Sequence, residues 1–348
     1  MNSSPLTRGL VALAAFVIFI AGLRAASSLI VPFLLATFLA VITSPLMIQF
    51  KKWGVGSGIS IVLILLMVLG ILWMILQVAG ASINEFTRSS EDYQIRLRGI
   101  TREWAIWLRS KGVDTDSETL NSFFNPANTM RVVVNTLTTF ITGILTNTFL
   151  ILLTTVFLLF ELAGLPNKLR LAFGEDHPSV PGWERFTASL NRYLAIKSVV
   201  SLLTGISAYT LVRILGIDFA LLWGILAFMF NYVPNIGSIM AAVPPVMLSL
   251  VQYGTARAAT CLLGYVVINV VYGNLIEPRV MGKGLGLSTL VVWMSLVFWG
   301  WVFGPVGMLL SVPLTMVVKI AMESKADTMW LAVLLGSDPG AEPKGGSL

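Results

Sequence analysis

Eight long stretches of this chain contain no Asp, Glu, Lys or Arg, and charged segments separate them. A helix rises about 1.5 Å per residue and the hydrocarbon of a bilayer is about 30 Å thick, so about 20 apolar residues cross it. Backbone groups find no water there, which makes helices the expected form. The pattern therefore predicts an all-α, polytopic integral membrane protein. The uncharged stretches are 9–23, 25–50, 53–84, 132–160, 198–212, 219–256, 258–276 and 284–318.

Two of these stretches, 219–256 and 284–318, are about twice as long as one span requires. Each is broken near its middle by a proline and then a glycine. Proline removes an amide and clashes with the preceding helical turn, whereas glycine permits a tight reversal. We therefore predict two re-entrant helical hairpins in addition to about six full transmembrane helices. The breaks contain Pro234 with Gly237, and Pro305 with Gly307.

The charges between the stretches predict an orientation. Lys and Arg accumulate in cytoplasmic loops, and short loops carry most of this signal. With six full spans and two hairpins that do not cross, most short-loop Lys and Arg residues share a side with both termini. We therefore expect cytoplasmic termini, with the two hairpins entering from opposite faces in inverted orientation. A ten-span arrangement, in which every hairpin arm crosses, also leaves both termini inside and stays open.

One polar region, 82–131, carries an amphipathic stripe of residues that recur at three- and four-residue steps. Its acidic and basic residues nearly cancel, so attraction to anionic lipid is not favoured. Two interpretations stay open: the helix rests on the membrane domain, or it forms a contact between subunits of a homo-oligomer. The stripe consists of Phe86, Tyr93, Leu97, Ile100, Trp104, Trp107 and Leu108.

This layout divides the chain into seven predicted segments. They are transmembrane helices 1 to 3 (1–81), an extramembrane amphipathic helical region (82–131), transmembrane helix 4 (132–161), a cytoplasmic connector (162–192), a helix with the first hairpin (193–256), a helix with the second hairpin (257–322), and a cytoplasmic tail that is partly disordered (323–348).

Composition removes several functional classes. Of 348 residues, 56% are hydrophobic and only 11% are charged, and this charged fraction is too small to cover a water-soluble globule. The net charge of +6 therefore concerns the sides of a bilayer, and we expect no nucleic acid partner. One cysteine, Cys261, and one histidine, His177, allow no disulfide framework and no Cys/His zinc cluster. We predict no enzyme activity, no catalytic residues, no metal and no cofactor.

The breaks in the two long stretches are the first candidate site. A broken helix exposes unpaired amides at one end and carbonyls at the other, and these bind a solute without an ionised side chain. Such paired interruptions are typical of transporter binding sites, although proline-kinked packing helices are the alternative. The predicted substrate-binding residues are Asn231, Pro234, Asn235, Gly237, Ser238, Gly304, Pro305 and Gly307.

Ionisable and amide side chains near these breaks are candidates for ion or proton coupling, because polar groups inside a membrane are costly. Glu277 is the main one. Pro278 fixes the chain that follows it, and Arg279 or Lys283 is the expected partner. A structural ion pair and a proton-carrying role both stay open. The full set of coupling candidates is Glu277, Arg279, Lys197 and Asn269.

At these residues the chain resembles the autoinducer-2 exporter family of bacterial permeases, also called the PerM-type family. The matching pieces follow one order over about residues 190–320. They are Tyr193 with Lys197; Leu222 to Gly224; Asn231 to Ser238 with Pro244; Asn274 to Arg279 with Gly282 and Leu287; and Phe298 to Trp301 followed by Gly304 to Gly307 and Pro313.

The resemblance implies a permease of the bacterial inner membrane that exports a small polar metabolite, with the quorum-sensing signal autoinducer-2 as the namesake substrate. It also implies self-association. Some family members resemble sodium/proton antiporters, so a cation/proton antiporter is the first alternative function. A non-transporting membrane scaffold or regulator is the second. The expected partners are thus a small polar solute, the lipid bilayer and further copies of the chain, and alternating access is the expected mechanism.

Overall fold

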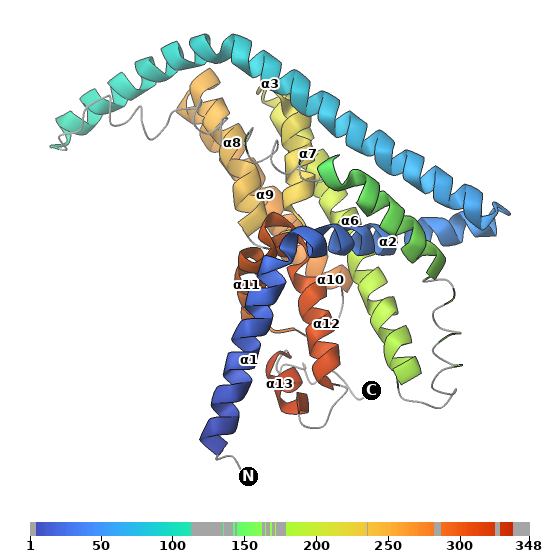
Figure 1. Ribbon diagram of the computed structural model, residues 1–348. Coiled ribbons are helices and arrows are strands. Elements are labelled where there is room, and N and C mark those ends of the chain that lie inside the picture. Colours follow the sequence, from blue (N-terminus) through green and yellow to red (C-terminus); the bar gives the residue numbers. More distant parts are fainter. Residues whose placement is uncertain are drawn as a thin grey trace, which may run out of the picture. The chain divides into compact units, whose positions relative to one another are not determined.

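The computed structural model describes residues 5–112, 145–161, 179–234, 236–281, 287–323 and 328–336, and the single positions 135, 142, 164, 168 and 171. All regular structure in this part of the chain is helical (Figure 1). The elements are α1 Pro5–Ala25, α2 Ser27–Lys52, α3 Ser57–Ser110, α6 Ser179–Ile214, α7 Ala220–Phe230, α8 Ile236–Tyr253, α9 Thr255–Asn269, the π-helix η1 Val270–Ile276, α10 Glu277–Met281, α11 Thr289–Leu309, α12 Ser311–Glu323 and α13 Met329–Leu334.

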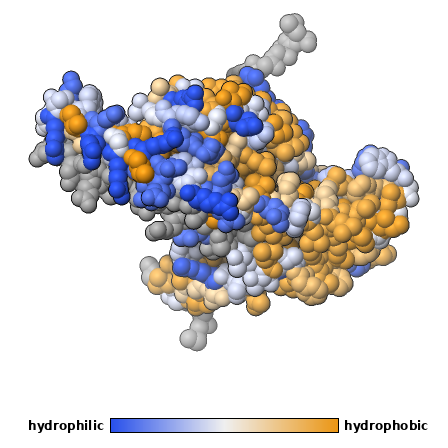
Figure 2. All heavy atoms as spheres, turned by 90° about the horizontal axis from the view of Figure 1, so that it is seen from above, coloured by the Kyte–Doolittle hydropathy of each residue, from blue (hydrophilic) through white to orange (hydrophobic). Residues whose placement is uncertain are grey.

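Six helical segments in the described residues are long and apolar enough to cross a membrane, which confirms the all-α polytopic prediction. Many of their large apolar side chains are exposed, as a lipid-facing surface requires, and Figure 2 shows broad hydrophobic areas on the face that it displays. The segments are Ser27–Lys52, Ser57–Phe86, Thr187–Ile214, Ile236–Tyr253, Thr255–Val280 and Thr289–Leu309.

This set differs from the predicted full spans. The first predicted span lies in α1, where the apolar segment is the shorter Leu13–Ala25, and the described part of the fourth predicted span is the shorter helix Leu145–Glu161. Conversely, α8 and α11 reach spanning length, although the sequence predicts hairpin arms there. The break inside α11 does not change the length or the apolar composition by which a span is recognised, because a glycine interrupts the helix without adding any polar side chain.

The chain forms two compact units. The first contains residues 1–61, 146–192 and 283–348, and the second contains residues 62–145 and 193–282. The boundary predicted between residues 81 and 82 is not a break in the helix, because α3 runs through it without interruption.

The core of the second unit lies where α3, α6, α7, α8 and α9 meet. Trp223 and Ala208 are fully buried in it, and Phe86, Tyr93 and Leu97 join it from α3. The first three members of the predicted stripe are therefore buried. Farther along α3 the stripe is displaced: Thr101 and Ala105 are buried, whereas Trp107 is exposed.

Two glycines bring α6 and α7 into backbone contact. A Cβ atom on Gly205 would lie 2.8 Å from the carbonyl oxygen of Gly224, and one on Gly224 would lie 2.8 Å from the Cβ of Tyr209. Small residues at such crossings permit close packing of membrane helices. The approach fixes α7 against the second half of α6.

In the first unit, α11 is broken at Gly304, whose φ of 64° and ψ of −147° are not helical. Only glycine adopts this backbone region readily. The chain turns back there, since a Cβ on Gly307 would lie 1.9 Å from the carbonyl oxygen of Trp299. The Trp299 indole then donates a hydrogen bond to the Thr315 hydroxyl on α12, at 3.0 Å. The sequence-predicted break at Pro305 is thus a reversal of the chain.

The end of this second hairpin packs against α1 and α2. Val302 and Phe303 share a small core with Ile20, and apolar residues near the start of α2 surround them. The Arg24 guanidinium lies over the Trp301 ring, 4.5 Å from its centre. The reversal at Gly304 therefore lies beside the junction of α1 and α2.

Candidate functional site

The first predicted hairpin is a closed helical hairpin of α7 and α8. At its base, the Asp218 amide donates to the Gln252 side-chain oxygen at 3.3 Å. The Tyr253 hydroxyl donates to the carbonyl of Gly216 at 2.8 Å. The start of α7 and the end of α8 therefore lie together, and the chain reverses between Phe230 and Ile236.

The tip of this hairpin is bound to α6 by two side-chain hydrogen bonds. Asn231, which is 6% exposed, donates from its amide nitrogen to the Ser201 hydroxyl at 2.9 Å. The Tyr232 hydroxyl donates to the Ser198 hydroxyl, also at 2.9 Å. Ser198 and Ser201 lie near the middle of the apolar segment Thr187–Ile214. The tip thus meets α6 midway along its apolar length.

A buried ion pair lies on the same part of α6. The Lys197 ammonium contacts the Glu277 carboxylate at 2.6 Å, and their side chains are only 5% and 17% exposed. The sequence offers Arg279 or Lys283 as the partner of Glu277; the Arg279 option is wrong, because Glu277 pairs with Lys197 and Arg279 forms no ion pair with another described residue. The other expected partner, Lys283, lies outside the described residues. A buried charge requires an opposite charge nearby, and Lys197 meets this requirement for Glu277.

The π-helix η1 directly precedes Glu277 and sets its direction. A π-turn adds one residue relative to an α-helical turn, so every later side chain is rotated by about 100° around the axis. The Tyr272 hydroxyl of η1 lies 3.0 Å from the Ser207 hydroxyl of α6. This contact ties η1 to the same helix that carries Lys197. π-turns are frequent at functional sites.

We define the polar layer as the side chains that join α6 to the hairpin tip and to α10. Most of its members are neutral groups that both donate and accept hydrogen bonds, and one ion pair lies beside them. Such a layer offers a neutral, hydroxyl-rich solute many partners. The polar layer consists of Lys197, Ser198, Ser201, Asn231, Tyr232 and Glu277.

The first two amides of the second arm, which the sequence predicts to be free, are hydrogen-bonded. The Ile236 amide donates to the Pro234 carbonyl at 2.6 Å, and the Gly237 amide donates to the Val233 carbonyl at 3.2 Å. The expectation of unpaired amides at the start of this arm is therefore wrong for Ile236 and Gly237, because the tight turn supplies their acceptors.

Gly237 has a packing role that the sequence does not show. A Cβ on it would lie 1.8 Å from the carbonyl oxygen of Phe230, so no other residue fits without movement of the backbone. Pro234 and Ser238 are half-buried beside it. Asn235 lies outside the described residues.

The remaining candidates are not members of the polar layer. Gly304, Pro305 and Gly307 belong to the other compact unit. Asn269 is half-buried, and its side-chain oxygen would lie 3.0 Å from a Cβ on Gly273. Among the described residues, no three His, Cys, Asp or Glu side chains come close enough to hold a metal ion.

Sequence reasoning missed Ser198 and Ser201. Ser201 lies four residues after Lys197 and eight after Tyr193, and Ser198 lies three residues before Ser201. This three- and four-residue spacing is the only signal for them, and it is weak because serine is common in membrane helices.

Comparison with known proteins decides the family. The AI-2E family transporter description matches residues 13–327. The chain belongs to the AI-2E transporter family. It is 40% identical over 319 residues to the AI-2 transport protein TqsA of Escherichia coli K12, covering 92% of each chain.

Other AI-2E relatives are less informative about substrate. A Haemophilus influenzae protein is 37% identical over 341 residues, with 96% of this chain and 98% of the relative covered. YhhT of E. coli K12 is 37% identical over 329 residues, with 94% and 93% covered. Both are described as transport proteins without a named substrate. The chain is thus a multi-pass membrane protein of a transporter family and not an enzyme.

Proposed function

We propose that this AI-2E family member exports a small polar metabolite across the bacterial inner membrane, with autoinducer-2 as the leading substrate. The observation that carries the proposal is the polar layer midway along α6. Polar and ionisable groups at such depth are costly even when they are paired, so a cluster of them is a candidate solute path by default. The resemblance to TqsA supports the choice of substrate.

The first hairpin is proposed to be re-entrant. α7 has 11 residues, and at about 1.5 Å per residue it is about 16 Å long, which is half of a bilayer core. Its base lies just past the end of α6 at Ile214, and its tip bonds to Ser198 and Ser201. A hairpin that starts at the end of a spanning helix and stops at its middle dips into the membrane without crossing it.

The second hairpin is not supported in the same way. Its reversal at Gly304 contacts the junction of α1 and α2, so the contact does not place it at mid-depth. This fits an arm that runs the full apolar thickness, as in the ten-span alternative. Pro305 and Gly307 remain predicted contributors to the solute path, and the cytoplasmic location of both termini remains a prediction.

The solute is proposed to exchange hydrogen bonds with the polar layer. Two hydrogen bonds hold the tip to α6, one from Asn231 to Ser201 and one from Tyr232 to Ser198. A hydroxyl-rich solute that takes over these partners replaces each bond at a small net cost, about 1 kcal/mol. Separation of the tip from α6 would open the path from one side. Alternating access then follows from movement of the hairpin against α6.

Cation/proton antiport is the second candidate, and the Lys197–Glu277 pair favours it. A proton and a cation would compete for the Glu277 carboxylate. Protonation would neutralise it and release Lys197, whereas a cation would bind the ionised carboxylate in place of the ammonium after the proton leaves. This pair is the only buried ion pair observed among the described residues.

Transport by the full chain in liposomes tests the proposal. The expected result is saturable autoinducer-2 uptake that Asn231→Ala lowers severalfold, because the layer loses a donor and leaves Ser201 unpaired. Asn84→Ala, at an exposed position of α3, is the matched control and leaves uptake unchanged. Uptake that is absent, or equal in wild type and Asn231→Ala, rejects the assignment.

The antiporter candidate needs a different readout. A sodium gradient imposed on the same liposomes would drive proton movement, measured with a pH-sensitive dye inside. Glu277→Gln abolishes this movement if the pair carries protons. Absence of sodium-linked proton movement in the wild type ends the antiporter case.

A further inference from the structure

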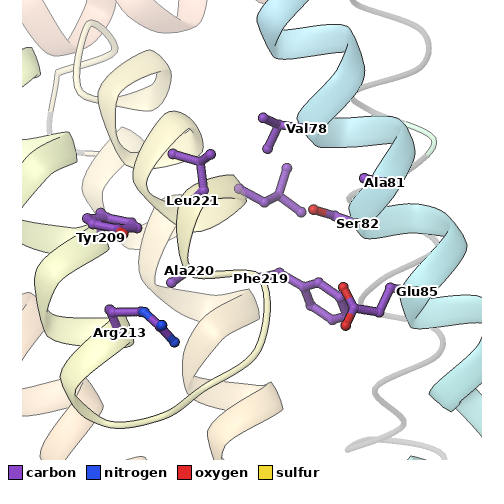
Figure 3. A pocket seen from close by; sticks show the side chains of 10 residues that line it. Val78, Ala81, Ser82, Glu85, Tyr209, Arg213, Phe219, Ala220 and Leu221 are labelled. Carbon is purple, nitrogen blue, oxygen red and sulfur yellow. The ribbon is translucent and has the colours of Figure 1, made fainter.

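A pocket in the second unit lies outside the polar layer and shares no residue with it. It has a volume of about 350 Å³ and opens between α3, the end of α6 and the start of α7 (Figure 3). The lining combines apolar side chains such as Val78 and Leu221 with two charged ones, Glu85 and Arg213. We call it the interfacial pocket.

The charged end of the interfacial pocket lies where two membrane-crossing segments stop. Glu85 is one residue from the end of the apolar segment Ser57–Phe86, and Arg213 is one residue from the end of Thr187–Ile214. Both helices therefore leave the hydrocarbon at the level of these two side chains. In Figure 3, Glu85 and Arg213 lie toward one end of the pocket and Val78 and Leu221 toward the other.

Within the described part of the chain, both of these charges lack an ionic partner. Glu85 and Arg213 are exposed. They belong to different helices and line one pocket with opposite signs. An occupant that carries both a phosphate and an ammonium group would satisfy both of them.

A strained residue shapes the pocket. Among the described residues, Phe219 is the only one other than glycine with a positive φ, at 62°. Its ring points toward α3, where it lies 6.2 Å from the Phe86 ring. A bulky residue holds this conformation only where its surroundings enforce it, and such residues cluster at binding sites. Here the conformation places the aromatic ring in the wall of the pocket.

We propose that the interfacial pocket binds an aminophospholipid of the phosphatidylethanolamine type. Arg213 binds the phosphate, Glu85 accepts hydrogen bonds from the primary ammonium, and the acyl chains lie along Val78 and Leu221. Leu221 is 48% exposed, which leaves the apolar end open to the lipid tails. A lipid held there would join α3 to the base of the first hairpin, because α7 begins at the same pocket.

Native mass spectrometry of the purified full-length protein tests this proposal. The probes are dioctanoyl phosphatidylethanolamine and dioctanoyl phosphatidylglycerol, which share the phosphate and differ in the ammonium. The wild type is expected to retain the ethanolamine lipid about tenfold better, as one charge-assisted hydrogen bond predicts. Arg213→Gln lowers retention of both lipids, whereas Glu85→Gln abolishes the preference and keeps the binding.

Three further variants separate loss of the pocket from unrelated losses of lipid binding. Leu221→Trp fills the apolar end with both charges intact and is expected to lower retention of the ethanolamine lipid. Arg102→Gln and Glu103→Gln change exposed charges on α3 outside the pocket and leave retention unchanged. Equal retention of the two lipids by the wild type would overturn the proposal. So would a preference that survives Glu85→Gln. Loss of solute transport in Arg213→Gln without any lipid preference would also overturn it and assign the pocket to the solute.

Discussion

The Lys197–Glu277 pair permits the sharpest energetic prediction. Glu277→Gln keeps the shape of the side chain and removes its charge, which leaves a Lys197 side chain of 5% exposure without a counter-charge. Removal of one partner of a buried pair costs about 3–5 kcal/mol. Lys197→Met has the converse effect on Glu277. The double variant is expected to lose far less than the sum, so the coupling energy is on the order of 3 kcal/mol.

Unfolding free energies in mixed detergent micelles measure this cycle. An exposed pair in the same chain provides the control: Lys168 and Glu161 contact at 2.8 Å with side chains 64% and 51% exposed. Its coupling is expected to be at most about 1 kcal/mol, because water screens the charges. If the two substitutions in the buried pair prove additive, or if both cycles give the same coupling, then burial of the pair does not govern its energetics and the reasoning is refuted.

Two further predictions concern the first hairpin. Gly237→Ala forces a Cβ against the Phe230 carbonyl and is expected to destabilise the protein and impair transport, whereas Gly58→Ala, with open space around it, is neutral in the same unfolding and uptake assays. Tyr93→Phe removes a 2.6 Å hydrogen bond to Asp218 at the hairpin base and is expected to cost about 1.5–3 kcal/mol of unfolding free energy. Burial, and then the Asp218 carboxylate, raise the pKa of Tyr93. The difference in unfolding free energy between wild type and Tyr93→Phe therefore stays constant below pH ~10 and shrinks above it, because the phenol then ionises on unfolding. A free-energy difference that varies between neutral pH and ~pH 9 would contradict the hydrogen bond as its source.

The helices and both chain reversals could be predicted because their signals are local. Long uncharged stretches leave the chain no alternative to helix in a bilayer. The breaks at Pro234 and Gly304 lie within a few residues of the glycines and prolines that cause them. The amphipathic stripe of α3 was correct over its first part for the same reason.

The partners within the site could not be predicted, because they depend on distant residues and on helix phase. Glu277 meets a lysine 80 residues away, and the π-helix before it turns the side chain from the direction that an α-helix would give. The amino-acid sequence of Val270–Ile276 contains no signal that distinguishes this seven-residue π-helix from an α-helix. The bonding of the Ile236 and Gly237 amides could not be predicted either, because only the geometry of the turn shows which carbonyls they reach.

The account depends on the depth of the first hairpin, and spin-label accessibility in a bilayer measures that depth directly. Single labels are placed by Ile239→Cys next to the tip, Leu202→Cys near the middle of α6 and Tyr253→Cys at the hairpin base, in a chain with Cys261→Ala. All three labelled positions are exposed. We expect the labels at 239 and 202 to show the same high accessibility to oxygen and low accessibility to a water-soluble nickel complex, with the label at 253 near the aqueous surface. A label at 239 that reaches the opposite aqueous surface would show that the hairpin crosses the membrane and would contradict the account.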